Sequence, residues 1–452
     1  MSYDLFPHQI KGAVFLSGST GTKGLFFGMG TGKTITALEA AKQVGNRRML
    51  VIAPPIALPM WHAEATAYLG REAQILSTGS TAIRMFASIL VVSYAIATTR
   101  AAELIDWVAD GVLICDESHA LKSPTAKRTS AILGWRGIAS SAAYSWMLTG
   151  TPITRWNDDV FAFLCNADLA GVRERLGGIT LEKFRLKHTI RQKRQFAGAR
   201  FPVDMVVGNR NTELLGEWIY SSDNGRGAPL ALRVDLKEVF ENMPPLTVNR
   251  YNIKLEVDAE LRAALKAMET MSVADIASKL ASKEPALATV RRQLGVAKVK
   301  AAAAEIAERI ESGESVLVGA WHTDVIDALE QILSDRGYRC VTLDGRTSAT
   351  KKRNLTTAWN TGQLDVLVGQ IAAMGVSLNL QEGGSQIIVV ESDWSPSVMD
   401  QFFARLWRYG QEKHVHVDIL TSDTKLDKAI DRIGSTKARE QAKFNEVGRS
   451  QD

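Results

Sequence analysis

Cysteine is scarce in this sequence, and long apolar runs are missing. Among 452 residues only Cys115, Cys165 and Cys340 are cysteines, and they lie far apart. This spacing excludes a disulfide scaffold and a Cys-x-x-Cys zinc site, and it is typical of a reducing compartment. No run of about 18 apolar residues occurs, so no membrane-spanning helix is predicted. The N-terminal residues MSYDLFPHQI lack the basic start and apolar core of a signal peptide. We therefore expect a cytoplasmic protein with no membrane partner.

A large excess of either charge is also missing. Lys and Arg number 54 and Asp and Glu 49, which leaves a formal net charge of +5. This balance permits an acidic partner without requiring one. Basic residues concentrate in residues 181–200 (LEKFRLKHTIRQKRQFAGAR), where seven Lys/Arg accompany one Glu. Two interpretations of this segment stay open: a solvated helix face, or a clamp on nucleic acid.

Apolar residues are abundant, at 46% of the chain, and form short runs between amphipathic stretches. The first block of runs predicts strands at residues 25–28, 49–53, 89–93, 112–116 and 145–149. The second block predicts strands at 316–320, 340–344, 366–370, 387–391 and 415–420. Predicted helices between strands include residues 35–44 and 325–336. This order favours α/β domains with parallel sheets covered on both faces. We expect such domains at residues 1–170 and 305–430, a mainly helical, basic region at 171–304 and a polar tail at 431–452.

A glycine-rich loop follows the first predicted strand. It consists of Gly28, Met29, Gly30, Thr31, Gly32, Lys33 and Thr34. Its glycines let backbone N–H groups curl around phosphate oxygens, and the helix that follows adds the positive end of its dipole. Lys33 would neutralise the β- and γ-phosphates, and the Thr34 hydroxyl would hold Mg²⁺. Phe27 stands at the first glycine position of the G-x-x-x-x-G-K-[ST] pattern. The alternative is an ordinary glycine-rich turn.

Two adjacent acids, Asp116 and Glu117, end the apolar run at residues 112–116. The carboxyl end of a buried parallel strand is where such sheets bind ligands. Asp116 would coordinate Mg²⁺, and Glu117 would orient and polarise an attacking water. A polar turn is the alternative, which the phosphate loop upstream disfavours.

These two segments resemble motifs I and II of superfamily-2 helicases, and the chain is similar to the Swi/Snf-type branch of double-stranded-DNA translocases. Residues 5–9 (LFPHQ) resemble the adenine-reading Q motif. Further segments at family positions are 53–55 (APP) with Trp61 for motif Ia, 93–94 (SY) for motif Ib, 148–152 (LTGTP) for motif III and 233–245 (RVDLKEVFENMPP) between the lobes.

The second half of the chain continues the resemblance. Residues 344–347 (DGRT) resemble the segment after motif IV, 373–380 (AMGVSLNL) motif V, and 393–396 (DWSP) with 400–411 (DQFFARLWRYGQ) motif VI. Within the last stretch, Gln401, Arg405, Arg408, Gly410 and Gln411 fall at the family spacing. The sequence departs from the pattern at Phe27 and Gly28, where an acidic pair is frequent, and at Ser377, where glycine is usual.

The resemblance implies two RecA-like parallel-sheet domains, an ATP and Mg²⁺ site, and roles for individual residues. Lys33, Asp116, Glu117, Arg405 and Arg408 would be catalytic. The nucleotide would be held by Gln9, Gly28, Met29, Gly30, Thr31, Gly32, Lys33, Thr34, Gly375 and Gln401. Thr34 and Asp116 would bind the metal, and His119, Thr149 and Thr151 would couple nucleotide state to DNA grip. DNA contacts would come from Pro54, Ser93, Lys122 and Arg346. Arg405 and Arg408, three residues apart, would share a helix face that reaches the nucleotide.

The function expected from these residues is a DNA-stimulated ATPase that moves along double-stranded DNA, remodelling forks or protein–DNA complexes or annealing strands. The resemblance is to a compact bacterial or phage-encoded member, acting as a monomer or as a subunit of a DNA-processing complex. Two alternatives stay open. One is a strand-separating DNA or RNA helicase, and the other is a nucleotide-dependent binding module that hydrolyses little ATP.

Overall fold

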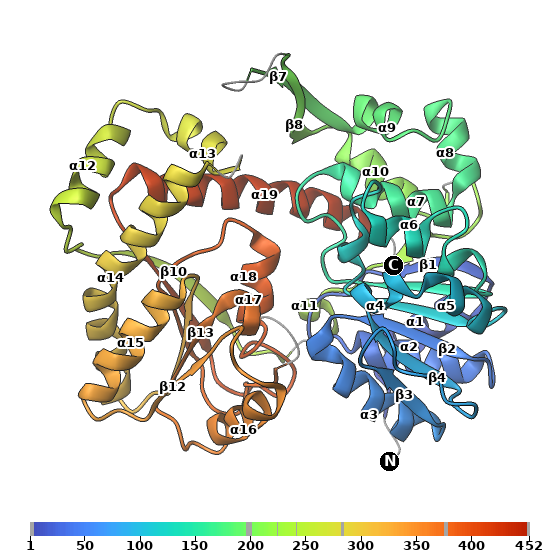
Figure 1. Ribbon diagram of the computed structural model, residues 1–452, viewed down its shortest axis with the longest axis horizontal. Helices are drawn as coiled ribbons and strands as arrows, with labels where there is room; N and C mark the ends of the chain where they lie inside the picture. The colour runs from blue at the N-terminus through green and yellow to red at the C-terminus, as the bar shows by residue number, and fades with distance from the viewer. Residues whose placement is uncertain are drawn as a thin grey trace. The chain divides into compact units, whose positions relative to one another are not determined.

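A computed structural model describes residues 4–195, 201–223, 225–240, 242–281, 284–374 and 378–449. The chain forms two compact units (Figure 1). Unit 1 comprises Met1–Val239 and Arg439–Asp452, and unit 2 comprises Phe240–Ala438. Both units have a parallel β-sheet with helices on its two faces, as the alternation of apolar runs predicts.

Unit 1 contains a seven-stranded sheet of order β3-β4-β2-β5-β6-β1-β9, in which every pairing is parallel. Its strands are β1 (Gly21–Leu25), β2 (Met49–Ala53), β3 (Ala73–Leu76), β4 (Ile89–Ser93), β5 (Val112–Asp116), β6 (Tyr144–Leu148) and β9 (Ala231–Leu232). Alternate residues supply the two cores, since Leu50 and Ile52 of β2 face one side and Met49 and Val51 the other. The continuous apolar runs are therefore strands buried on both faces.

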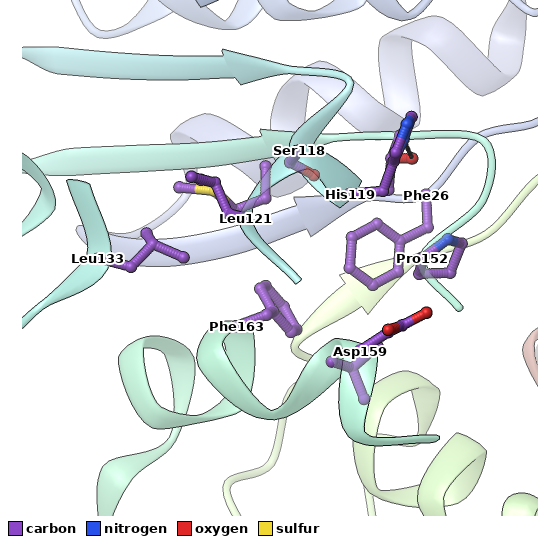
Figure 2. A pocket seen from close by; sticks show the side chains of 11 residues that line it. Phe26, Ser118, His119, Leu121, Leu133, Pro152, Asp159 and Phe163 are labelled. Atoms are coloured by element: carbon purple, nitrogen blue, oxygen red, sulfur yellow. Dashed lines mark hydrogen bonds between the residues drawn. The ribbon is translucent and has the colours of Figure 1, made fainter. Parts of the chain in front are cut away.

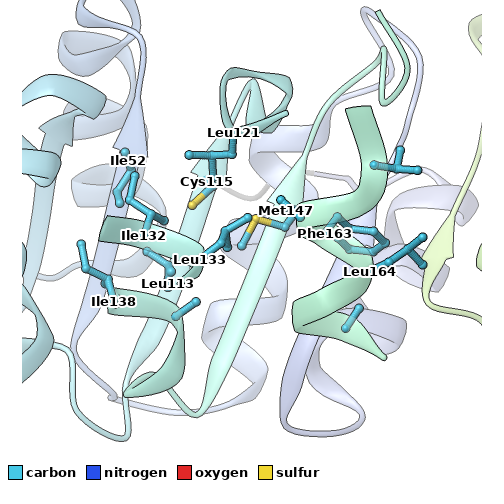
Figure 3. Close-up of a cluster of buried hydrophobic side chains, with 14 of the residues drawn as sticks. Ile52, Leu113, Cys115, Leu121, Ile132, Leu133, Ile138, Met147, Phe163 and Leu164 are labelled. Carbon is cyan, nitrogen blue, oxygen red and sulfur yellow. The ribbon is translucent and has the colours of Figure 1, made fainter. Parts of the chain in front are cut away.

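Helices cover both faces of this sheet. On one side lie α1 (Pro7–Ser17), α2 (Lys33–Gln43) and α3 (Leu58–Leu69). On the other lie α4 (Tyr94–Thr99), α5 (Ala101–Trp107), α6 (Lys127–Leu133) and α7 (Phe161–Ala167). Figure 3 shows part of this second core, where Phe163 and Leu164 of α7 pack near Met147 of β6. Further helical segments of the unit are η1 (Pro55–Ala57), η2 (Ser118–Leu121), η3 (Ile138–Ser140), η4 (Asn157–Val160), α8 (Leu169–Leu176), α9 (Leu181–His188), α10 (Thr212–Tyr220) and α11 (Leu236–Val239).

The basic segment is only partly helical. After α9 the chain forms β7 (Thr189–Arg194), which pairs antiparallel with β8 (Val203–Asn209). The interpretation of the whole segment as a helix face is therefore wrong beyond His188. The β-branched pair Thr189 and Ile190 and the valines of β8 explain the strand pairing, because such side chains fit a pleated surface. Residues 196–200 lie outside the described residues.

Unit 2 contains a six-stranded sheet of order β10-β15-β14-β11-β13-β12, again with only parallel pairings. Its strands are β10 (Leu246–Asn252), β11 (Val316–Ala320), β12 (Cys340–Leu343), β13 (Val366–Gln370), β14 (Gln386–Val389) and β15 (Val415–Thr421). The sequence did not predict β10, whose polar and apolar residues mix because it lies at the edge of the sheet. Each of its residues nevertheless pairs with β15.

The helices of unit 2 form three groups. One sheet face is covered by α14 (Pro285–Glu311) and α15 (Thr323–Asp335), and the other by α16 (Ala349–Asn360), α17 (Ile371–Met374) and α18 (Pro396–Phe403). A separate apolar cluster joins α12 (Ala259–Met268), α13 (Val273–Ala281), the start of α14 and the start of α19 (Lys425–Arg449). Among the described residues, no helix combines the length and apolarity that a membrane span requires.

The expected domain boundaries differ from those observed. Residues 171–304 do not form one body, because the chain up to Val239 packs with unit 1 and the chain from Phe240 with unit 2. The expected polar tail at 431–452 is helical as far as Arg449. The helix is held in place by Phe444, because this ring is fully buried and its centroid lies 5.3 Å from that of Tyr220.

His188 predicts acid sensitivity of unit 1. Burial lowers the pKa of this histidine from 6.5 to about 4. The unfolded chain therefore binds a proton that the folded chain refuses, so stability is lost as pH falls from 6.5 to about 4. The expected loss is up to about 3 kcal/mol, and urea unfolding at pH values on both sides of this window measures it. In the variant His188→Phe, this part of the fall in unfolding free energy should be missing. If the variant has the same pH dependence as the wild type, other groups cause the acid sensitivity.

Candidate active site

The phosphate loop connects β1 to α2, and its glycines are needed where they stand. Within residues 28–34, positive φ is confined to Gly30 at 75° and Gly32 at 84°. A Cβ atom on Gly32 would lie 2.2 Å from Nε2 of Gln9. Phe27, at the departing first position, is fully buried, and its ring lies 5.8 Å from the ring of His8. The departure is therefore tolerated because that position needs no positive φ.

The start of α2 fits a phosphate group. Gly32 is its N-cap and offers no side chain to the first N–H groups of the helix, which leaves them suited to an anion. Lys33 begins the helix, and its Nζ donates to the carbonyl oxygens of Phe27 and Gly28, both at 3.1 Å. The Thr31 hydroxyl donates to the Gly28 carbonyl at 2.8 Å. The loop thus holds its shape through its own side chains, with the ammonium group at its centre.

Helix α1 is fastened to this loop by two side chains. Gln9 donates through Nε2 to the Thr31 carbonyl at 3.3 Å and accepts from the Phe6 amide at 3.0 Å. Nε2 of His8 lies 2.8 Å from the same Thr31 carbonyl oxygen, and burial lowers the pKa of His8. Gln9, the expected adenine reader, is therefore placed beside the phosphate loop.

Asp116 lies at the end of β5 with both carboxylate oxygens engaged. Oδ2 accepts a hydrogen bond from Trp61 Nε1 at 2.8 Å, and Oδ1 accepts from the Glu117 amide at 3.0 Å. Burial of the carboxyl group, reinforced by the charge of Glu117, raises the pKa of Asp116 to about 6, while the Trp61 bond and Lys33 oppose the rise. The Asp116 carboxylate lies within electrostatic reach of Lys33, which precedes Thr34 in the chain. Carboxylate and hydroxyl oxygens are ligands that suit Mg²⁺.

Glu117 adopts a left-handed backbone conformation, with φ 49° and ψ 49°. Such a conformation is uncommon for a residue other than glycine and is typical of functional sites. Nδ1 of His119 lies 3.2 Å from the Glu117 carboxylate and 3.2 Å from the Thr149 hydroxyl. The Thr151 amide donates to that hydroxyl at 3.1 Å. The structure therefore brings together the expected catalytic acid and the three expected coupling residues in one continuous network.

A small hollow lies next to this network (Figure 2). His119 and Pro152 face it from the loops after β5 and β6, and Asp159 and Phe163 from the helical segment that follows. Asp159 accepts from the Thr154 amide at 2.8 Å and from its hydroxyl at 2.7 Å. These bonds fix the chain after the Thr149 turn.

The expected DNA contacts are placed differently in the two units. In unit 1, Pro54 and Ser93 lie at the carboxyl ends of β2 and β4, and Lys122 donates to the Thr154 hydroxyl at 2.6 Å. In unit 2, Arg346 forms ion pairs with Asp344 and, at 2.6 Å, with Asp327. Two carboxylates thus compete with phosphate for Arg346, and its contact with DNA stays a prediction.

The two expected arginine fingers are not on one helix, as their spacing predicted, because α18 ends at Phe403. They nevertheless meet at one carbonyl group. Arg405 donates through Nη1 to the Leu378 carbonyl at 3.0 Å, and Arg408 contacts the same oxygen at 3.4 Å. Gln401, on α18, accepts through its carbonyl from Arg405 Nε at 2.9 Å. Gly375, the remaining expected nucleotide contact, lies outside the described residues.

Sequence reasoning missed the role of Trp61, which it named only as part of the resemblance to motif Ia. The ring is buried, and its indole N–H donates a hydrogen bond to Asp116, which lies 55 positions away along the chain. The usable signal was chemical, because most buried indole N–H groups find an acceptor.

Comparison with known proteins gives a domain assignment for each unit. An SNF2-related domain matches residues 8–169, and a helicase conserved C-terminal domain matches residues 297–410. Together with the two parallel sheets, these matches define a RecA-like helicase core.

Curated relatives narrow this class. The DNA repair and recombination protein RAD54B of Homo sapiens is 25% identical over 496 residues, covering 95% of this chain and 54% of the relative. RAD54 of Oryza sativa subsp. japonica is 32% identical over 111 residues, covering 24% of this chain and 11% of the relative. A solved Sulfolobus solfataricus SWI2/SNF2 ATPase core in complex with double-stranded DNA is 18% identical and matches with a TM-score of 0.42, over 93% of this chain and 88% of that chain. The chain spans about half the length of the first curated relatives it matches. In two segments the chain is therefore similar to SNF2-related and helicase C-terminal domains, and over most of its length it is similar to DNA repair and recombination proteins.

Trp61 predicts a specific loss of metal–nucleotide binding. In Trp61→Phe the Asp116 carboxylate loses a hydrogen bond that favours its ionised form, so its pKa rises further and it competes less well for Mg²⁺. A hydrogen bond to a charged group is worth about 1.5–3 kcal/mol, so affinity for Mg²⁺-ADP should fall about tenfold or more by titration calorimetry. Trp146→Phe is the matched control, because Trp146 is equally buried and its Nε1 has no hydrogen-bond partner among the described residues. An equal loss in both variants would contradict the role of the Trp61 bond.

Proposed function

We propose that the protein is an ATPase stimulated by double-stranded DNA, which couples hydrolysis to movement along the duplex. The observation that carries the proposal is the network from Glu117 through His119 to Thr149 and Thr151. A glycine-rich turn or a passive binding module needs no such link between a strained acid and the neighbouring loop. The similarity to DNA repair and recombination proteins supports DNA as the partner.

The residues of unit 1 divide the chemistry between them. Lys33 and the first N–H groups of α2 bind the phosphates, and Asp116 and Thr34 hold the metal. When bound, Mg²⁺ neutralises charge on the phosphates. Glu117 orients the attacking water and receives its proton as the γ-phosphoryl group is transferred to that water, while the bond from the γ-phosphorus to the bridging oxygen breaks and ADP leaves. His119 contacts both the Glu117 carboxylate and the Thr149 hydroxyl, so a shift of one of these groups is transmitted to the other.

Arg405 and Arg408 supply positive charge from unit 2. In phosphoryl transfer, a guanidinium group that meets the developing charge accelerates the reaction by roughly 10³–10⁵. Their shared contact with the Leu378 carbonyl gives both groups one support.

Contacts with DNA are proposed to be made mainly to phosphates. Pro54, Ser93 and Lys122 lie at or after the carboxyl ends of strands in unit 1, where the network also ends. The ribbon of β7 and β8 adds basic residues that stand in solvent, including Lys193. Phosphate contacts predict weak sequence preference and strong salt dependence.

Stimulation by nucleic acid tests the function. The ATPase rate is measured without nucleic acid and with duplex DNA, single-stranded DNA or RNA, at equal nucleotide concentration and fixed salt. Duplex DNA should stimulate most, and Glu117→Gln should abolish turnover while it keeps ADP binding, because only the base is lost. Strongest stimulation by a single strand would favour the strand-separating helicase, and equal rates in all samples would leave the nucleotide-dependent binding module.

The ribbon predicts a change in salt dependence. Lys187, Lys193 and Arg210 are exposed, whereas Arg191 already pairs with Glu182 and Asp204. Replacing the three exposed residues by Gln should weaken duplex binding and lower the slope of log Kd against log salt by up to about 3, with basal ATPase unchanged. The control replaces Lys42, Arg47 and Arg136, three exposed cations near the amino ends of the strands. If both triple variants show the wild-type slope, then Lys187 at the end of α9, Lys193 of β7 and Arg210 after β8 make no phosphate contact.

A further inference from the structure

The chain returns to the phosphate loop at residues 231–235. Strand β9 pairs with β1 in parallel, and the pairing continues beyond the strands: the Phe26 amide donates to the Leu232 carbonyl at 2.8 Å and the Gly28 amide to the Val234 carbonyl at 2.7 Å. A Cβ atom on Gly28 would lie 3.2 Å from Oδ1 of Asp235. This short segment therefore follows the chain into the phosphate loop itself.

Arg233 lies in the middle of this segment with its side chain only 5% exposed. Nη1 donates to the carbonyl oxygen of Phe26 at 3.1 Å and to that of Gly150 at 2.9 Å. Nη2 pairs with the Asp235 carboxylate, which compensates the buried charge. One planar group thus binds Phe26, two residues before the phosphate loop, and the glycine between Thr149 and Thr151.

The Arg233 guanidinium joins the two chains just beyond the last paired residues of β1 and β6. Pairing of β1 with β6 ends at Leu25 and Leu148, with one further bond from the Thr149 amide to the Leu25 carbonyl at 3.2 Å. The carbonyls of Phe26, one residue beyond Leu25, and of Gly150, two residues beyond Leu148, are joined by Arg233 instead. A lysine has a single nitrogen, whereas the rigid fork of arginine holds two acceptors and a carboxylate at once.

We propose that Arg233 is a positioning residue that fixes the distance between the phosphate loop and the Thr149–Thr151 turn. Through that turn it keeps His119 and Glu117 aligned with the phosphates that Lys33 holds. The proposal rests on the proposed ATPase function for its kinetic consequence, but the fixed distance itself is a property of the fold.

The kinetic test uses Arg233→Lys, which keeps the charge, and Arg233→Gln. A misplaced turn leaves nucleotide binding largely intact and lowers turnover, so kcat with duplex DNA should fall on the order of 10- to 100-fold. KM for ATP should change by less than about threefold, because the lost alignment matters in the transition state. The ratio of stimulated to basal rate should fall as well.

Arg71→Gln is the matched control. The Arg71 guanidinium also donates to two backbone carbonyls, those of Arg47 and Ser88. These carbonyls precede β2 and β4, at the amino ends of the strands, whereas the phosphate loop follows a carboxyl end. Arg71→Gln should lower the thermal unfolding midpoint without changing kcat or the stimulation ratio. A merely structural role for Arg233 would give the same pattern in Arg233→Lys, with a lower midpoint and wild-type kinetics, and would overturn the proposal.

Hydrogen exchange provides a readout that needs no turnover. In Arg233→Lys, amides of residues 26–33 and 148–153 should exchange faster than in the wild type, and those segments should be unchanged in Arg71→Gln. Unchanged exchange in both segments would refute the positioning role even if the wild-type protein hydrolyses ATP. A wild-type protein that hydrolyses no ATP, together with faster exchange in the variant, would instead refute the proposed function alone.

Discussion

The parallel register of β1, β5 and β6 is the constraint on which the site depends. Leu25, Asp116 and Leu148 end their strands in neighbouring positions of one sheet. The phosphate loop, the acidic pair and the Thr149 turn leave the sheet from these three ends. A slip of one residue in any pairing would turn the core side chains to the opposite face. The hydrophobic core therefore also sets the alignment of the catalytic groups, which no loop interaction alone would maintain.

Much of this fold follows from the sequence because its central strands are apolar throughout. Strands β2, β4, β5, β11 and β13 have the predicted bounds. The strand predicted at residues 25–28 overlaps β1 (Gly21–Leu25) only at Leu25, since the first residues of β1, GTKG, carry no apolar pattern. Edge strand β10 and the ribbon of β7 and β8 were missed for the related reason that partly exposed strands mix polar and apolar residues. The order of β10 also comes from pairing with β15, which lies far along the chain, and no local pattern shows this.

The candidate site divides in the same way. The loop, the acidic pair and His119 are contiguous motifs, so spacing and resemblance identified them. The bonds from Trp61 to Asp116 and from Arg233 to Gly150 connect residues 55 and 83 positions apart. Such contacts are decided by tertiary packing, and a buried indole or guanidinium reveals in the sequence only that it needs acceptors, not which ones. For Arg405 and Arg408 the sequence-based prediction was wrong, because it assumed that the helix continues beyond the end of α18 at Phe403.

The backbone conformation of Glu117 has a consequence for how this protein tolerates change. A left-handed residue with a Cβ atom stores about 1–2 kcal/mol that glycine would release. Glycine at this position would thus relieve strain in the fold while removing the side chain expected to activate water. A stabilised version of this protein that keeps the Glu117 carboxylate therefore has to gain its stability away from the end of β5.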